Sequence, residues 1–88
     1  MADDVLNDAI VRAEMAIEIL NQARGIVSNR IHELEANDPA MAEDLRIRRR
    51  ALVDLQHGIR VEDRDAVEAV IDTWGPRVRD ESLFWREF

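Results

Sequence analysis

Cysteine and lysine are absent from this chain of 88 residues, and it holds only three glycines and two prolines. Without cysteine, neither a disulfide nor a thiolate zinc site can form. The glycines are isolated in the sequence, so there is no glycine-rich loop of the kind that binds phosphate. A domain of this size buries only roughly 60% of the surface that its unfolded chain exposes. We therefore expect its stability to depend on close helix packing or on a partner subunit.

Long apolar runs are also missing. No stretch approaches the roughly 20 apolar residues needed to cross a bilayer, and the acidic first residues do not look like a secretory signal. We expect a cytoplasmic protein with no membrane contact. Acidic residues outnumber basic ones by 19 to 12, which gives a net charge of −7. This charge disfavours direct nucleic-acid binding, which depends on basic residues, although it is also what keeps many small proteins soluble.

The most regular pattern covers residues 3–36. Apolar residues recur there at alternating spacings of three and four, with Arg24 in the one place where the pattern breaks. This period predicts a long helix that packs along another helix. The residues of the predicted apolar stripe are Leu6, Ile10, Ala13, Ile17, Leu20, Val27, Ile31 and Leu34.

A second helix is predicted over residues 39–58. Asp38 is a suitable N-cap, and proline at position 39 fits the first turn, where its missing N–H is not needed. The short connection makes this helix an antiparallel neighbour of the first. Its predicted apolar stripe is interrupted by Arg48 and consists of Met41, Leu45, Leu52, Leu55 and Ile59.

A third, shorter helix is predicted over residues 63–74, with acidic residues in its first turn and an end at Gly75-Pro76. The C-terminal segment 77–88 could form one or two helical turns or remain extended. The expected fold is all-α: a single domain, 1–88, with a long antiparallel hairpin, a shorter third helix and an aromatic C-terminal segment. A monomer would form a three-helix bundle, but we expect a homodimer in which two hairpins complete a four-helix core.

The aromatic residues are concentrated at one end of the chain. All four lie within the last fifteen residues, where they close the protein's own core or anchor a partner, since large aromatic side chains often dominate interfaces. With one neighbouring leucine, they form the first set of predicted partner-binding residues: Trp74, Leu83, Phe84, Trp85 and Phe88.

Arginines are concentrated in the predicted second helix. Arg46, Arg49 and Arg50 spread over its outer surface, and we predict that they dock against an acidic partner, although nearby acids could also balance them. Two further arginines, Arg24 and Arg48, interrupt the apolar stripes. A charge within a core is costly unless it is paired, so we predict that they pair with Glu68 and Asp72 and fix the helix register. Alternatively, their long stems reach the edge of the core.

Catalytic and metal-binding motifs are missing. His32 and His57 belong to no zinc-binding pattern, and the few hydroxyl residues have no base and orienting group in a triad-like arrangement. We expect no cofactor and no enzyme activity. The pattern favours a non-catalytic protein-interaction module, an adaptor or regulatory subunit acting through helix faces and the aromatic segment. The alternative is an acidic inhibitor of the phage or mobile-element type, such as an anti-CRISPR-like protein or nucleic-acid mimic, that blocks a basic site.

Overall fold

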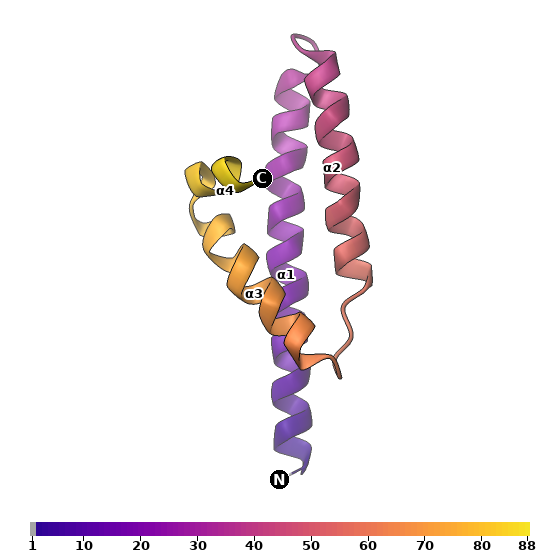
Figure 1. Ribbon diagram of the computed structural model, residues 1–88, viewed down its shortest axis with the longest axis vertical. Helices are drawn as coiled ribbons and strands as arrows, with labels where there is room; N and C mark the ends of the chain where they lie inside the picture. Colours follow the sequence, from indigo (N-terminus) through magenta and orange to yellow (C-terminus); the bar gives the residue numbers. More distant parts are fainter. Residues whose placement is uncertain (1) are drawn as a thin grey trace.

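The computed structural model describes residues 2–88, which form four helices and no strand (Figure 1). The predicted all-α class is therefore confirmed. The first two helices end within two residues of the predicted positions, whereas the third extends further than predicted. The helices are α1 (Ala2–Leu34), α2 (Pro39–His57), α3 (Arg64–Arg79) and α4 (Glu81–Glu87).

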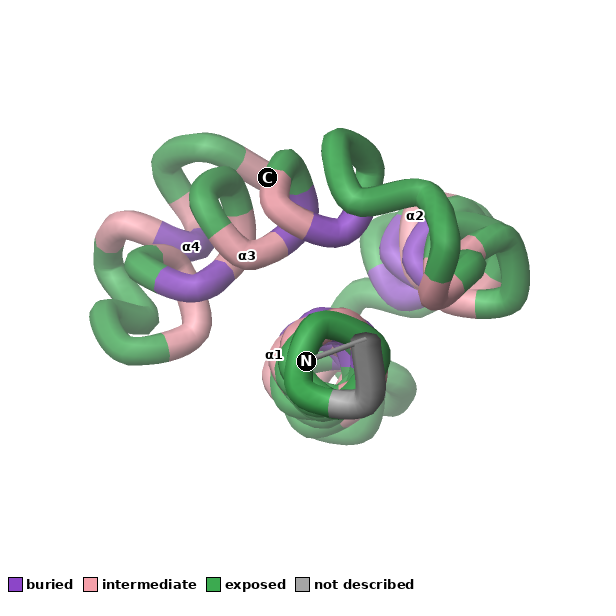
Figure 2. The backbone as a smooth tube through the Cα atoms, turned by 90° about the horizontal axis from the view of Figure 1, so that it is seen from below, coloured by how far each residue is buried: buried purple, intermediate pink, exposed green. Residues whose placement is uncertain are grey.

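The long helix α1 is the common packing partner of its neighbours. It packs against both α2 and α3, while α4 packs against α3. In Figure 1, α2 runs back along α1, and α3 crosses α1 on its other side. Seen along the long axis in Figure 2, α2 and α3 stand apart above α1. The resulting shape is elongated, with extents of 55 × 22 × 16 Å.

Aspartates begin the three shorter helices. The Asp38 carboxylate accepts a hydrogen bond from the backbone N–H of Met41 at 3.1 Å, as the sequence predicts. In the same way, Asp63 accepts from the backbone N–H of Ala66 at the start of α3, and Asp80 accepts from that of Leu83 at the start of α4. Each cap satisfies a backbone N–H that has no partner within its helix and contributes about 1 kcal/mol. These caps fix where the chain turns.

The buried face of α1 differs in part from the predicted apolar stripe. Ala16 and Ala23 are fully buried, whereas Ile17 is 37% exposed and Leu6 is 57% exposed. Two helices pack on adjacent sides of α1, and small residues at the centre of this face allow a close approach. The N-terminal end of α1 projects beyond α3 in Figure 1, and Leu6 is the fifth residue of this helix. Within residues 4–34, the buried residues of α1 are Ala13, Ala16, Leu20, Ala23, Val27 and Ile31.

The predicted end of the third helix at residue 74 is wrong, because α3 continues through Gly75 and Pro76 to Arg79. Proline removes one backbone N–H donor, and α3 packs on α1 with Val67, Val70 and Gly75 buried. A Cβ atom added at Gly75 would make an ordinary contact of 3.7 Å with the side chain of Ile19, so this part of α3 lies against α1. Packing therefore overrides the local helix-breaking signal.

Candidate functional site

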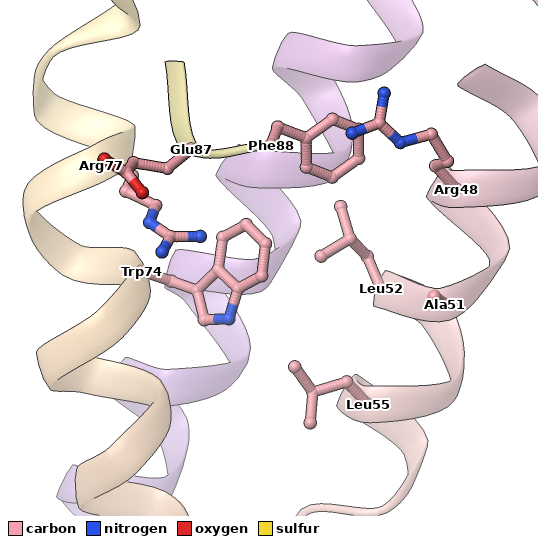
Figure 3. A pocket seen from close by; sticks show the side chains of 8 residues that line it. All are labelled: Arg48, Ala51, Leu52, Leu55, Trp74, Arg77, Glu87 and Phe88. Carbon is pink, nitrogen blue, oxygen red and sulfur yellow. The ribbon is translucent and has the colours of Figure 1, made fainter. Parts of the chain in front are cut away.

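A groove of about 360 Å³ lies between α2 and the arm formed by α3 and α4 (Figure 3). In Figure 3, Leu52 and Leu55 from α2 point into the same space as Trp74 from α3. Phe88 reaches the groove from the C-terminal end of the chain. We call this surface the aromatic groove; its lining is Arg48, Ala51, Leu52, Leu55, Trp74, Arg77, Glu87 and Phe88.

The aromatic groove is supported by a cluster of the four aromatic side chains. Phe84 is fully buried, and its ring centroid lies 5.1 Å from that of Phe88, 5.2 Å from that of Trp85 and 6.1 Å from that of Trp74. Such ring pairs contribute about 0.5–1.5 kcal/mol each beyond burial. The C-terminal segment therefore folds back onto its own core.

The predicted partner-binding set divides according to this burial. Phe84 is a core residue and offers no surface to a partner in this fold. Trp74, Trp85 and Phe88 are only partly buried, and Trp74 and Phe88 also line the aromatic groove. Leu83 is partly buried as well but lies outside the groove lining.

Two arginines stand at the rim of the aromatic groove. The guanidinium carbon of Arg48 lies 4.5 Å from the ring centroid of Phe88, and that of Arg77 lies 4.9 Å from the ring of Trp74. These are cation–π distances, and both cations remain next to the apolar lining. Arg48 also lies 3.8 Å from the Asp44 carboxylate, a long contact on an exposed surface. Glu87 is the one acidic residue of the lining.

A second hollow, of about 340 Å³, lies between α1 and α2. It brings together the three arginines predicted to dock a partner and adds Arg24 from α1. We call it the arginine hollow; its lining is Arg24, Ser28, Arg46, Arg49, Arg50 and Val53. The sequence alone did not place Arg24 beside the other three, because its position depends on the rotation of α1 against α2.

The predicted register pairs between Arg24 or Arg48 and the acids of α3 are wrong. Glu68 instead forms a two-armed pair with Arg12, with nitrogen–oxygen distances of 2.8 and 2.6 Å. Asp72 forms no hydrogen bond or ion pair within residues 4–88. Arg24 donates to the side-chain oxygen of Gln56 at 2.6 Å. The reason is that Arg24 faces α2, whereas Glu68 belongs to α3 on the other side of α1.

The Arg12–Glu68 pair ties α1 to α3 near the start of α3. Hydrogen bonding from Arg12 lowers the pKa of the Glu68 carboxyl below its ordinary value of 4.5. The same bond raises the pKa of Arg12. About a third of each side chain stays exposed, at 31% and 30%. No charged residue is buried within the part of the chain whose burial is described.

The described residues contain neither a metal-binding cluster nor a membrane-spanning helix. No three potential metal-binding side chains gather there, and His32 is 86% exposed beside Glu35. No described helix combines the length and apolar character required to cross a membrane. The candidate site therefore consists of two surfaces on either side of α2, the aromatic groove and the arginine hollow.

No protein-family model matches the chain, and no curated protein or solved structure is significantly similar to it. The fold defines an all-helical bundle. Any functional proposal must therefore come from the chemistry of the two surfaces.

Proposed function

We propose that this chain is a non-catalytic protein-interaction module whose aromatic groove receives an acidic amphipathic helix of a partner protein. The observation that carries the proposal is the combination of an open apolar groove with two guanidiniums at its rim. Binding a helix through its apolar face is a common mode of peptide recognition.

The apolar lining supplies the contact area. Leu55 is 40% exposed, although it points into the groove, and Trp74 and Phe88 are each only partly buried. Removing such side chains from water contributes about 25 cal/mol for each Å² of apolar surface, and the cost of ordering the two partners is subtracted from this gain. Partly exposed aromatic residues in a concave site are frequent anchors of interfaces. The groove therefore fits an apolar helix face with residues spaced three and four apart.

The rim supplies the preference for an acidic partner. Arg48 and Arg77 place two guanidiniums beside the apolar lining, where Glu87 is the one acidic residue, and Asp44 makes only a long contact of 3.8 Å to Arg48 from outside the lining. Carboxylates that flank the apolar face of a bound helix would lie opposite these guanidiniums. Exposed pairs of this kind contribute about 0–1 kcal/mol each. They select the orientation and sign of the partner, while apolar contact supplies most of the affinity.

The test places a photo-crosslinking side chain at Ala51, in the groove lining, of the full-length chain in the cells that produce it. The same chain then carries Leu55→Arg, which fills the groove with a charge. The matched control is Ile47→Arg, because Ile47 lies on the same helix, is 62% exposed and lies outside the groove lining. Both variants are checked for an unchanged melting temperature.

We expect crosslinks to one acidic amphipathic helix of a partner. Leu55→Arg should lower the yield of crosslinked partner at least tenfold, and Ile47→Arg should leave this yield unchanged. Crosslinks to a second copy of this chain would overturn it in favour of self-association. The exposed Val5 and Leu6 of the projecting end of α1 would then be natural occupants of the groove. Equal losses with both variants would also contradict it.

A further inference from the structure

The arginine hollow holds positive charge that the protein itself does not neutralise. Arg24 and Arg49 bond only to neutral side chains, and Arg50 forms no hydrogen bond or ion pair within the described residues. By contrast, six of the nine other arginines pair with carboxylates: Arg12, Arg30, Arg46, Arg48, Arg60 and Arg64. Three unpaired guanidiniums at one hollow are unexpected in a chain with a net charge of −7.

Neutral partners hold two of these guanidiniums in place without cancelling their charge. Nη1 of Arg49 donates to the Ser28 hydroxyl at 2.9 Å. Nη1 of Arg24 donates to the Gln56 side-chain oxygen at 2.6 Å, and the Gln56 amide in turn donates to the Asn21 side chain at 2.7 Å. Donors fixed in this way lose less freedom when they bind a ligand. The arrangement is that of an anion site rather than an internal ion-pair network.

The position of the arginines follows from helix geometry. Arg46, Arg49, Arg50 and Val53 are spaced at i, i+3, i+4 and i+7 on α2, and Arg24 and Ser28 are four apart on α1, so each set shares one helix face. Arg46 is already engaged by Glu35 and Glu43 at 3.2 and 3.1 Å. The available charge of the hollow is therefore that of Arg24, Arg49 and Arg50.

We propose that the arginine hollow binds a phosphate group, either as free phosphate or as a small phosphate monoester. A phosphate carries up to two negative charges and several acceptor oxygens, which matches three guanidiniums. The Ser28 hydroxyl accepts from Arg49 and keeps its own O–H for a ligand oxygen. Val53 is the single apolar residue of the lining, so a polar ligand fits better than an apolar one. The volume of about 340 Å³ lies within the range of small-ligand sites.

In the test, ligands are titrated into the full chain at constant ionic strength, and binding is monitored by the NMR signals of the backbone amides. Three ligands are compared: inorganic phosphate, glycerol 3-phosphate and the dicarboxylate succinate. The variant is Arg50→Gln, which breaks no hydrogen bond or ion pair within the described residues. Its matched control is Arg60→Gln, since Arg60 is another exposed arginine, is 76% exposed and lies outside the hollow.

We expect saturable shifts at residues 24, 28, 49 and 50 with at least one phosphate ligand. Loss of one charge-assisted contact weakens binding by about tenfold or more, so Arg50→Gln should bind about tenfold more weakly and Arg60→Gln should bind like the original chain. Tighter binding of inorganic phosphate or of glycerol 3-phosphate identifies which source the site prefers.

Three outcomes would overturn the phosphate assignment. The first is the absence of saturable shifts in the hollow with both phosphate ligands. The second is equal weakening by Arg50→Gln and Arg60→Gln, which would show diffuse attraction of anions to surface arginines. The third is succinate binding as tightly as the phosphates. None of these outcomes affects the proposed use of the aromatic groove, because that surface lies on another face of α2.

Discussion

The two faces of α2 have the same spacing and opposite chemistry. Residues 48, 51, 52 and 55 line the aromatic groove, and residues 46, 49, 50 and 53 line the arginine hollow. Both sets follow i, i+3, i+4 and i+7, and they are offset by two residues, which is about 200° around a helix. The first set faces the arm of α3 and α4, while the second lies beside α1 with three unpaired charges. The period of the helix thus groups the residues of each face, and the chemistry of those residues determines what each face can bind.

The two faces of α2 also differ in how deeply their residues are buried. Leu52 is 2% exposed and belongs to the core cluster, together with Leu45 and the fully buried Phe84. Val53, the next residue, lies on the arginine side and is only partly buried. We therefore expect changes at buried residues of the groove side, such as Leu52, to alter the free energy of unfolding strongly, and changes at its exposed residues, such as Leu55, to alter mainly partner binding. Changes in the arginine hollow should alter the free energy of unfolding little and should alter ligand binding instead.

The largest expected effect is that of Leu52→Ala. Removing a buried leucine side chain leaves a cavity and costs about 2–5 kcal/mol, a large part of the stability of a small domain. Urea unfolding followed by circular dichroism measures this loss. The matched control is Val53→Ala, one position away on the other face, which should cost less than about 1 kcal/mol because Val53 is only partly buried. Similar costs for the two variants would show that the faces do not differ in burial as described.

A smaller, pH-dependent effect is expected for Glu68→Gln, which breaks the bond from Arg12. Because the folded state lowers the pKa of Glu68 below 4.5, this pair stabilises the fold above the pKa of the unfolded chain. The stabilisation is lost as the pH falls through the lower pKa of the folded state. Glu68→Gln should therefore be less stable than the original chain at pH 7, and the difference should disappear under acidic conditions.

The measurement for this pair is the urea midpoint at a series of pH values. The matched control is Glu14→Gln, which removes the same charge from an exposed position on α1, and Glu14 has no ion pair within the described residues. An equal pH dependence for both variants would show that net charge, rather than the Arg12–Glu68 bond, is responsible.

The smallest expected effect on stability is that of Arg50→Gln. Arg50 forms no hydrogen bond or ion pair within the described residues, so the free energy of unfolding should change by less than about 0.5 kcal/mol. At low salt the direction should be a slight gain, because one of three neighbouring like charges is removed. The gain should vanish at high salt, since the screening length falls from about 30 Å at 0.01 M to about 3 Å at 1 M. Thermal melts of Arg50→Gln and the original chain at the two salt concentrations measure this difference. A clear loss of stability in Arg50→Gln would assign Arg50 a structural role.

Most of the fold was predictable because it depends on local signals. The apolar period of α1, the Asp38 cap and the short turn after Leu34 predict the antiparallel hairpin. The continuation of α3 through Pro76 was not predictable in this way. It accompanies the packing of α3 on α1, where Gly75 is buried, and no local signal reports packing between residues so far apart in the chain.

The candidate site was predictable only in part. The clustering of Arg46, Arg49 and Arg50 followed from their spacing on one helix. The addition of Arg24, the engagement of Arg12 by Glu68 and the burial of Phe84 depend on how α1 is rotated against its two neighbours. Buried alanines set that rotation. Because Ala16 and Ala23 carry little hydrophobicity, a pattern that weights large side chains misses them.

The sequence by itself determined that this protein is all-helical, where its main helices begin, and which residues share a face of each helix, because periodicity and capping act within a few residues. Only the tertiary structure decided which faces meet. It placed the aromatic segment in the core and beside α2, left one apolar groove open, and gathered three unpaired arginines from two helices. These outcomes depend on close packing between residues far apart in the chain, which local sequence does not encode.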